Sequence, residues 1–233
     1  MQIVILSGGE GSRLGELTKN SPKGLIKINK KPFMSYLIES IIKYYPSSIH
    51  FCLGKYSDKY LDYLNNIKLN FKWTYSLEDE NQLLGTGGAI KNALNFLEDI
   101  FIIQYGDTLL EIDYRSLINY HINSGKKMTI SMKSVANIND NPNILCKKDA
   151  EGIMTCIYDK KKYKNIGNFI DYGALVLNKE VFTNNLPEKF DLSSMQKNLS
   201  RSKDCSFYEV SSNFIEIGNK ESLRKAKSII TNV

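Results

Sequence analysis

The sequence has few of the residues that build metal sites or disulfide scaffolds. It contains two histidines and four cysteines, Cys52, Cys146, Cys156 and Cys205, and no two of these cysteines form a CxxC pair. This spacing argues against a structural zinc site and more strongly against a disulfide scaffold. We therefore expect four reduced thiols, most of which fill the core.

Long apolar runs are also missing. No segment approaches the roughly 20 uninterrupted apolar residues that a membrane-spanning helix needs. The first residues, MQIVILSGGEG, have no basic leader of the kind found in secretory signal peptides. We therefore expect a cytoplasmic protein that has no membrane partner.

The composition supplies a core and an excess of positive charge. Of the 233 residues, 42% are hydrophobic, which excludes a disordered chain. Lysine and arginine total 31 against 25 acidic residues, for a formal charge of +6. This excess either lies on the solvated surface or lines a site for an anionic ligand. No linker or internal repeat interrupts the chain, so we predict one continuous domain over residues 1–233.

The first half of the chain alternates strands with helices. Short β-branched runs predict strands, and apolar residues at helical spacing predict helices. The expected strands cover residues 2–6, 48–53, 70–76 and 99–105, and the expected helices cover 33–45, 55–66 and 88–97. From about residue 128 the segments MTISMKSV, GIMTCIYD and ALVLNKEVF resemble strands with less helix between them. We predict an α/β fold with a mainly parallel central sheet and a mixed or antiparallel second half.

The strongest local signal is LSGGEGSRL, residues 6–14, directly after the first strand. Ligands of open α/β sheets bind beyond the carboxyl ends of the strands, and glycines let backbone N–H groups approach phosphate oxygens closely. Arg13 adds guanidinium donors suited to phosphate. The GGxG pattern matches neither GxGxxG nor the P-loop. The alternative is a tight turn without a ligand, with Arg13 on the surface.

Three further segments carry groups suited to a phosphate ligand. Lys23 follows Pro22 and provides a point charge, although a solvated lysine is the commoner outcome. The cluster LLGTGGAI, residues 83–90, precedes a helix and directs its N–H groups at a base or sugar. Asp107 ends a buried strand, where a carboxylate either coordinates Mg²⁺ or caps the next turn. Both readings of Asp107 stay open.

Five motifs resemble one enzyme family. The run GGEGSRLGELTKNSPKGLIKINKKPF resembles the signature GGxGTRLxPLT…PKPxxxIxxKP of the sugar-1-phosphate nucleotidylyltransferases. LLGTGGAI, FIIQYGDTLLEID, GIMTCIYDK and NFIEIGNKESLRKAK follow in the family's order and resemble PLGTxGA, a strand ending in GD, GxIxxFxEK and xxDIGTPEDYxxA. The resemblance extends from residue 1 to about residue 227. Short heptose and hexose 1-phosphate enzymes, such as the D-glycero-D-manno-heptose 1-phosphate guanylyltransferases, are the most similar members.

The resemblance implies a fold and an activity. The fold is Rossmann-like with three α/β/α layers, in which residues 1–127 bind nucleotide and residues 128–227 bind the sugar phosphate. The implied reaction transfers a nucleoside monophosphate, with GTP favoured as donor, to a heptose or hexose 1-phosphate and releases pyrophosphate. The product would be an NDP-sugar for capsule or lipopolysaccharide synthesis. The nucleobase, the sugar and the oligomeric state, monomer or homodimer, are left open.

The resemblance also gives the site residues their roles. The residues implied to bind the nucleotide are Leu6, Gly8, Gly9, Gly11, Ser12, Arg13, Glu80, Gly85, Thr86 and Gly88. Those implied to bind the sugar phosphate are Lys23, Tyr105, Gly106, Lys160 and Asp171. Asp107 and Glu216 are implied to hold the cofactor Mg²⁺, and Arg13, Lys23 and Asp107 are implied to be catalytic. The reaction needs no protein nucleophile, since charge neutralisation and in-line positioning supply the catalysis.

Four positions depart from the family pattern. Gly24 replaces the second proline of PKP, from which we expect a looser backbone around Lys23. Leu83 replaces the proline of PLGT. Glu216 stands where the family has its second metal aspartate and reaches one methylene further. Asp171 replaces an asparagine, which places an acid beside the sugar and suggests an unusual or amine-bearing substrate.

Three alternatives remain beside this reading. The departures at Gly24 and Glu216 are compatible with a catalytically weakened sensor of a nucleotide sugar. Transfer of CMP to another phosphorylated small molecule shares the first motif, but LGTGGA argues against it. A nucleic-acid ligand would need basic residues interleaved with aromatics, and KKKYK at 160–164 is too short for that.

Overall fold

Four parallel strands form one half of the main sheet. The computed structural model describes residues 1–9, 11–135, 141–183 and 185–230. The parallel strands run in the order β6-β1-β4-β5. They are β1 (Gln2–Ser7), β4 (Ser48–Leu53), β5 (Trp73–Leu77) and β6 (Ile100–Tyr105). Every residue of β1 and β4 is buried, as their nearly continuous apolar sequences predict for strands covered on both faces.

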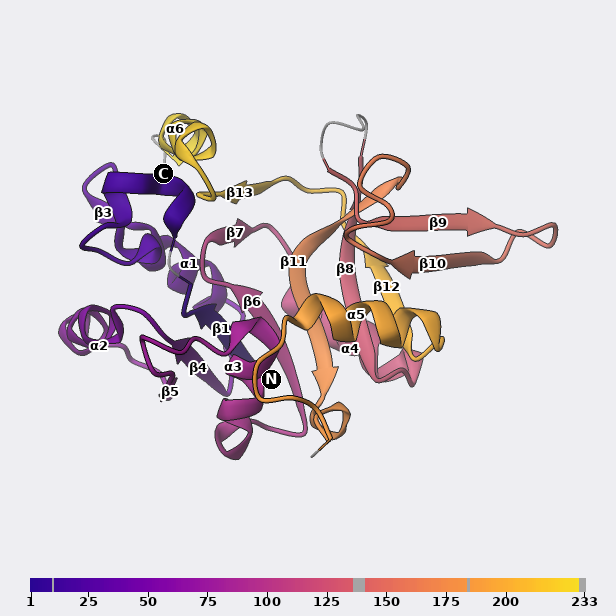
Figure 1. Cartoon of the computed structure of the whole chain (residues 1–233), viewed down its shortest axis with the longest axis horizontal. Helices are drawn as coiled ribbons and strands as arrows, with labels where there is room; N and C mark the ends of the chain where they lie inside the picture. Colours follow the sequence, from indigo (N-terminus) through magenta and orange to yellow (C-terminus); the bar gives the residue numbers. More distant parts are fainter. Residues whose placement is uncertain (10, 136–140, 184, 231–233) are drawn as a thin grey trace.

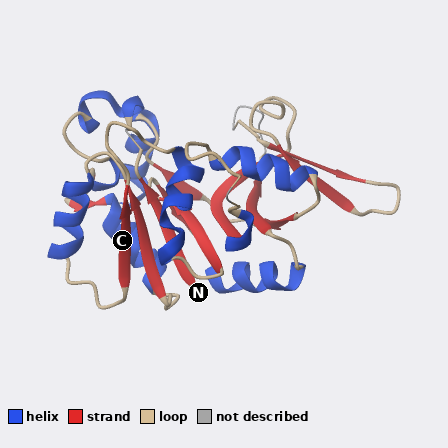
Figure 2. Cartoon of the chain, turned by 60° about the horizontal axis from the view of Figure 1, so that its bottom comes forward, coloured by secondary structure: helices blue, strands red, loops and turns tan. Residues whose placement is uncertain are grey.

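Helices cover both faces of this sheet (Figures 1 and 2). They are α1 (Phe33–Ile42), α2 (Ser57–Asn66), α3 (Gly85–Ala93), α4 (Tyr114–Ser124) and α5 (Leu192–Arg201). Alternate side chains of β1 join two separate core clusters: Ile3 and Ile5 pack with α1, α2 and α4, whereas Val4 and Leu6 pack with α3 and α5. This alternation along the strand produces the three expected layers.

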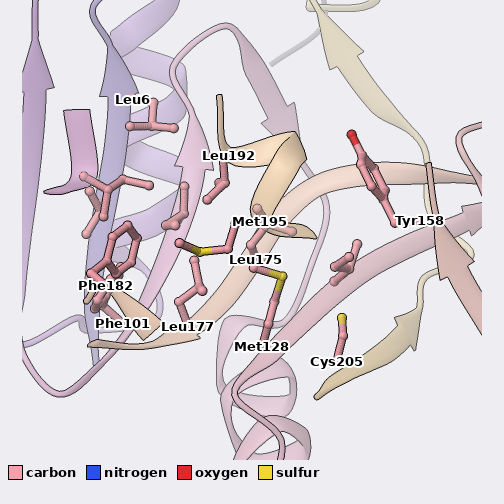
Figure 3. Packing of buried hydrophobic residues seen from close by; sticks show 14 of the residues in the cluster. Leu6, Phe101, Met128, Tyr158, Leu175, Leu177, Phe182, Leu192, Met195 and Cys205 are labelled. Atoms are coloured by element: carbon pink, nitrogen blue, oxygen red, sulfur yellow. The ribbon is translucent and has the colours of Figure 1, made fainter. Parts of the chain in front are cut away.

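The second half of the chain extends the sheet with strands of mixed direction. β11 (Phe169–Asn178) pairs antiparallel with β6 and with β8 (Met128–Ser134), and β12 (Cys205–Glu209) pairs parallel with β8. The two halves share one core, because Leu6 and Cys205 belong to the same cluster, in which Leu192 and Met195 of α5 also lie (Figure 3). The predicted fold class is therefore confirmed.

A short second sheet brings the C-terminal segment to the end of β6. β7 (Thr108–Leu110) pairs antiparallel with β13 (Phe214–Glu216), after which α6 (Lys220–Ile229) follows. A two-stranded ladder, β2 (Lys27–Ile28) with β3 (Lys31–Pro32), lies near the start of α1. The β7–β13 ladder places residues more than 100 positions apart next to one another.

The hairpin of β9 (Ile144–Lys148) and β10 (Met154–Tyr158) projects from the body of the molecule (Figure 1). Cys146 lies directly opposite Cys156 in this hairpin, with 4.0 Å between their Cα atoms, and the two form a disulfide. The expectation of four reduced thiols is wrong for this pair, because antiparallel pairing makes neighbours of cysteines that are ten positions apart. Cys52 and Cys205 are free and buried, as expected.

Two further features of the structure concern the surface and the membrane. The lysines of the segment KKKYK, residues 160–164, are exposed on a turn after β10, while its tyrosine is buried. Across the described ranges, no helix has both the length and the apolar character required to cross a membrane.

Candidate active site

A cavity of about 390 Å³ opens where β1 and β6 end. It brings together most of the predicted site residues from the two glycine clusters, the PKG segment and the end of β6. The predicted residues that line it are Leu6, Gly8, Gly9, Gly11, Ser12, Arg13, Lys23, Gly85, Thr86, Tyr105, Gly106 and Asp107. Glu80, Gly88, Lys160, Asp171 and Glu216 are not among the lining residues.

Two glycines of the first loop, Gly8 and Gly11, lie where a side chain would be crowded or the backbone has a positive φ. A Cβ on Gly8 would lie 2.7 Å from Glu78 Oε1 and 3.2 Å from the backbone N of Gly54. Gly11 has φ of +66°, and its carbonyl accepts hydrogen bonds from Leu14 N at 2.9 Å and Thr18 Oγ1 at 2.9 Å. The loop therefore folds tightly over the end of β1 and leaves the cavity open beside it.

The second glycine cluster opens α3 but serves packing as much as ligand access. Gly85 begins the helix with φ of +74° and lines the cavity. Gly87 and Gly88 donate their N–H groups to Phe190 O, at 2.9 and 3.2 Å. A Cβ on Gly88 would clash with the carbonyl of Glu188. The predicted nucleotide contact of Gly88 is thus not supported, because the segment before α5 occupies its amide.

Asp107 lies at the centre of the charged groups. Lys23 Nζ donates to Asp107 Oδ2 at 2.6 Å, and the two side chains are 12% and 31% exposed. The Asp107 carbonyl accepts the Ile217 N–H at 3.0 Å, which fixes the end of β13 against the end of β6. Glu216 pairs with Thr108 in the β7–β13 ladder. This small sheet is therefore what brings Glu216 toward Asp107.

Asp107 and Glu216 are the two carboxylates that could hold a divalent cation. Burial raises the pKa of Glu216, and the negative charge of Asp107 raises it further, while Lys23 and Arg13 act in the opposite direction. A cation between two such acids would relieve their repulsion, and Mg²⁺ binds one or two carboxylates together with phosphate and water oxygens. The described residues contain no cluster of three or more histidine, cysteine or acidic side chains suited to a metal. A substrate would have to complete the coordination.

The backbone around Lys23 is anchored. Gly24 is buried, and its N–H donates to the hydroxyl of Tyr60 at 3.1 Å. Tyr60 belongs to α2, is 3% exposed and lines the cavity beside Lys23. The backbone at the position of the missing proline is therefore held by a side chain of α2.

The sugar-phosphate half places Lys160 and Asp171 near the cavity without lining it. Burial raises the pKa of Asp171 to about 6, and hydrogen bonds from Gln196 and from the Gly173 N–H counteract this shift, as does the charge of Lys160. Lys160 also lowers the pKa of Glu216. Gln196 Nε2 donates to Asp171 Oδ2 at 2.7 Å, and within the described structure Gln196 Oε1 is buried without a hydrogen-bond partner.

The sequence reasoning missed several lining residues. Glu80 is exposed and accepts a hydrogen bond from Tyr56 N, whereas Glu78 lines the cavity. Burial raises the pKa of Glu78, and its Oε2 accepts the Leu84 N–H at 2.7 Å. Glu78 directly follows β5. An acid at the carboxyl end of a parallel strand is therefore the sequence signal that could have identified Glu78 as a site residue.

Ser7 and Asp191 were also missed. Ser7, the last residue of β1, is 7% exposed and lines the cavity, and its Oγ has no hydrogen-bond partner in the described part of the chain. Asp191 lies at the start of α5 and lines the cavity beside Gly85. No motif includes Asp191, because its place is set by the packing of α5 on α3.

Comparisons with known proteins agree on one family. Residues 2–232 match the family model described as nucleotidyl transferase. D-glycero-alpha-D-manno-heptose 1-phosphate guanylyltransferase of Aneurinibacillus thermoaerophilus is 30% identical over 231 residues, covering 97% of each chain. The enzyme of the same description from Campylobacter jejuni is 31% identical over 225 residues, covering 95% of this chain and 96% of its own.

Solved structures show the same relationship. HddC from Yersinia pseudotuberculosis, in a complex with GMP-PN, superposes with a TM-score of 0.78 at 26% identity and 99% coverage of both chains. A putative glucose-1-phosphate thymidylyltransferase from Bacillus anthracis superposes with a TM-score of 0.84 at 18% identity, covering 100% of this chain and 96% of its own, which shows the shared fold.

Proposed function

This chain belongs to the nucleotidyl transferase family, and from that premise we propose that it transfers a nucleoside monophosphate from a nucleoside triphosphate to a sugar 1-phosphate and releases pyrophosphate. The observation that carries the proposal is the convergence of the glycine loop, Lys23 and Asp107 on one cavity at the strand ends. This is where an open α/β sheet binds phosphorylated ligands. The relatives named as heptose 1-phosphate guanylyltransferases support GTP and a heptose 1-phosphate as the first substrates to test.

The charges of the site support in-line phosphoryl chemistry. In our proposal the glycine loop and Arg13 hold the triphosphate, Lys23 neutralises charge at the reacting phosphate, and Lys160 binds the phosphate of the sugar. Asp107 and Glu216 would hold Mg²⁺, which when bound supplies Lewis-acid neutralisation of phosphate oxygens. No residue has to form a covalent bond, because the sugar phosphate oxygen attacks the α-phosphorus directly.

Glu78 supports guanine as the base. Its carboxylate lines the cavity next to Gly8, and its Oε1 would lie 2.7 Å from a Cβ at that position. An ionised carboxylate accepts hydrogen bonds and cannot donate them. The N1–H and N2–H₂ groups of guanine are donors, so they complement it. Burial raises the pKa of Glu78, so a paired base would also compensate a partly desolvated charge.

We place the reaction in the cytoplasm, with the NDP-sugar product supplied to capsule or lipopolysaccharide synthesis. The test is pyrophosphate release from four nucleoside triphosphates against heptose, mannose, glucose and aminosugar 1-phosphates, with and without Mg²⁺. If Glu78→Gln reduces turnover with GTP more than turnover with the other nucleotides, the base assignment is supported. A protein that binds nucleotide but turns over no pair would instead be a sensor.

A further inference from the structure

A buried hydrogen bond ties the turn that carries Lys23 to α2. This turn, η2 (Lys23–Leu25), makes two backbone bonds of its own, from Leu25 N to Pro22 O at 3.0 Å and from Ile26 N to Lys23 O at 3.2 Å. The Gly24 N–H instead donates to Tyr60 Oη at 3.1 Å. Buried amides need a partner, so this contact ties the turn to α2.

Gly24 and Tyr60 fit one another closely. A Cβ on Gly24 would lie 2.7 Å from Tyr60 Oη, 3.3 Å from Tyr60 Cε1 and 3.2 Å from Met34 Cε. Only glycine therefore allows the tyrosine hydroxyl to reach the amide. At this position the PKP signature has proline, which restrains the backbone through its ring and has no N–H to satisfy. In this chain, a tyrosine from a neighbouring helix takes over the restraint.

The position of this turn sets the position of the Lys23 ammonium group. Lys23 Nζ lies 2.6 Å from Asp107 Oδ2, and a Cβ on Gly11 of the phosphate loop would lie 3.5 Å from Lys23 Cβ. A shift of the turn would therefore move Lys23 relative to both the acid and the loop. Misplacement of a charged group by about 1 Å is enough to slow a positioned reaction severely.

We propose that Tyr60 is a positioning residue that acts through Gly24 to hold Lys23 against the phosphates. The proposal rests on the proposed function, since it assigns Lys23 to the reacting phosphates. Tyr60→Phe removes the acceptor and leaves the buried Gly24 amide without a partner. We expect a loss of about tenfold in kcat, with a smaller change in the KM for the sugar phosphate, because the contact of Lys23 with the reacting phosphate is the one that is disturbed.

Tyr63→Phe is the matched control. Tyr63 lies on the same helix, α2, and its hydroxyl is 2.6 Å from Ser35 Oγ, away from the residues that line the cavity. Both variants lose one tyrosine hydroxyl from one helix, so thermal unfolding of both measures the general cost to the fold. Equal losses of kcat in Tyr60→Phe and Tyr63→Phe would overturn the proposal, as would an unchanged kcat in Tyr60→Phe.

A double-mutant cycle tests whether Tyr60 acts through Lys23. We expect Tyr60→Phe to cause no further loss in a Lys23→Ala background, because the group that it positions is gone. Gly24→Ala should reduce activity by displacing Tyr60, and adding Tyr60→Phe should not multiply that loss. A full additional effect of Tyr60→Phe in the Lys23→Ala protein would overturn the proposal.

Pyrophosphate binding separates this proposal from the proposed function. The same cycle is run by calorimetry with Mg-pyrophosphate, a ligand that does not depend on the nucleobase or the sugar. The positioning role is supported if Tyr60→Phe weakens pyrophosphate binding in the wild-type background but not in the Lys23→Ala background. This holds even if the wild-type protein turns over none of the substrates. Wild-type binding that does not change in Tyr60→Phe, or no wild-type binding, overturns it.

Discussion

Asp159 is the residue at which we expect one conservative substitution to affect both stability and the sugar-phosphate site. Its side chain is 4% exposed, and its Oδ1 accepts the N–H groups of Lys161 and Lys162 at 3.2 and 3.1 Å. Its Oδ2 lies 3.0 Å from Lys197 Nζ and 3.1 Å from Arg201 Nη2, both on α5. Asp159 thus ties the turn that begins with the predicted phosphate ligand at position 160 to a helix of the core.

Asp159→Asn keeps the shape of the side chain but removes the charge that faces the two cations. Hydrogen bonds to charged groups contribute about 1.5 to 3 kcal/mol each when buried. Lys197 and Arg201 are 37% and 50% exposed, so solvent screening reduces each to about 1 kcal/mol. We expect a loss of about 2 kcal/mol in the free energy of unfolding. For a chain of 233 residues this corresponds to a Tm lowered by about 4 °C.

The loss should depend on pH. Burial acts to raise the pKa of Asp159, but the hydrogen bonds from Lys162 and Lys197 and the charge of Lys197 outweigh it, so the pKa lies below its usual value. A carboxyl whose pKa is lowered on folding stabilises the protein above its unfolded-state pKa of about 3.9. The difference between wild type and variant should therefore be complete at neutral pH. It should disappear as the pH falls through the folded-state pKa.

The assay combines denaturant unfolding at several pH values with the KM for the sugar 1-phosphate. That KM should rise severalfold, because the turn loses its fixed position. Asp149→Asn is the matched control: Asp149 Oδ1 also accepts two backbone N–H groups, from Glu151 at 3.0 Å and Ile153 at 2.9 Å, in the turn of the projecting hairpin. An equal loss of stability in both variants, or a loss in Asp159→Asn that persists at low pH, would refute the reasoning.

Two further predictions concern the metal acid and the thiols. Asp107→Asn should abolish turnover while the chain stays folded, and more than a tenth of the wild-type rate at saturating Mg²⁺ would contradict its assignment as a ligand. Thiol titration of the denatured, unreduced protein should detect two groups, Cys52 and Cys205, and titration after reduction should detect four. Detection of four groups without reductant would contradict the Cys146–Cys156 disulfide.

Much of the parallel half of the fold could be predicted from local sequence. The apolar runs at 2–6 and 48–53 are strands, because strands covered on both faces need side chains without charge at every position. One element boundary differs from the prediction: α3 begins at Gly85 rather than at residue 88, since its first turn is formed against Phe190. Asp113 caps α4 by accepting the N–H groups of Arg115 and Ser116, a local contact between residues that are neighbours in the sequence.

Contacts between distant segments could not be predicted in the same way. The disulfide depends on the register of the β9–β10 hairpin, which the spacing of the two cysteines in the sequence does not specify. Glu78 and Glu80 both follow β5, but only Glu78 lines the cavity, whereas Glu80 accepts a hydrogen bond from Tyr56 N. Two acids two residues apart cannot be told apart by composition.

The sequence by itself determined the family, the three-layer fold and the glycine loop, because these depend on motifs and periodicities within single segments. The tertiary structure decided which charges meet. It placed Lys23 2.6 Å from Asp107, although 84 positions separate them, and it placed the hydroxyl of Tyr60 against the amide of Gly24. Such contacts arise from the packing of whole helices and strands, so no local pattern encodes them.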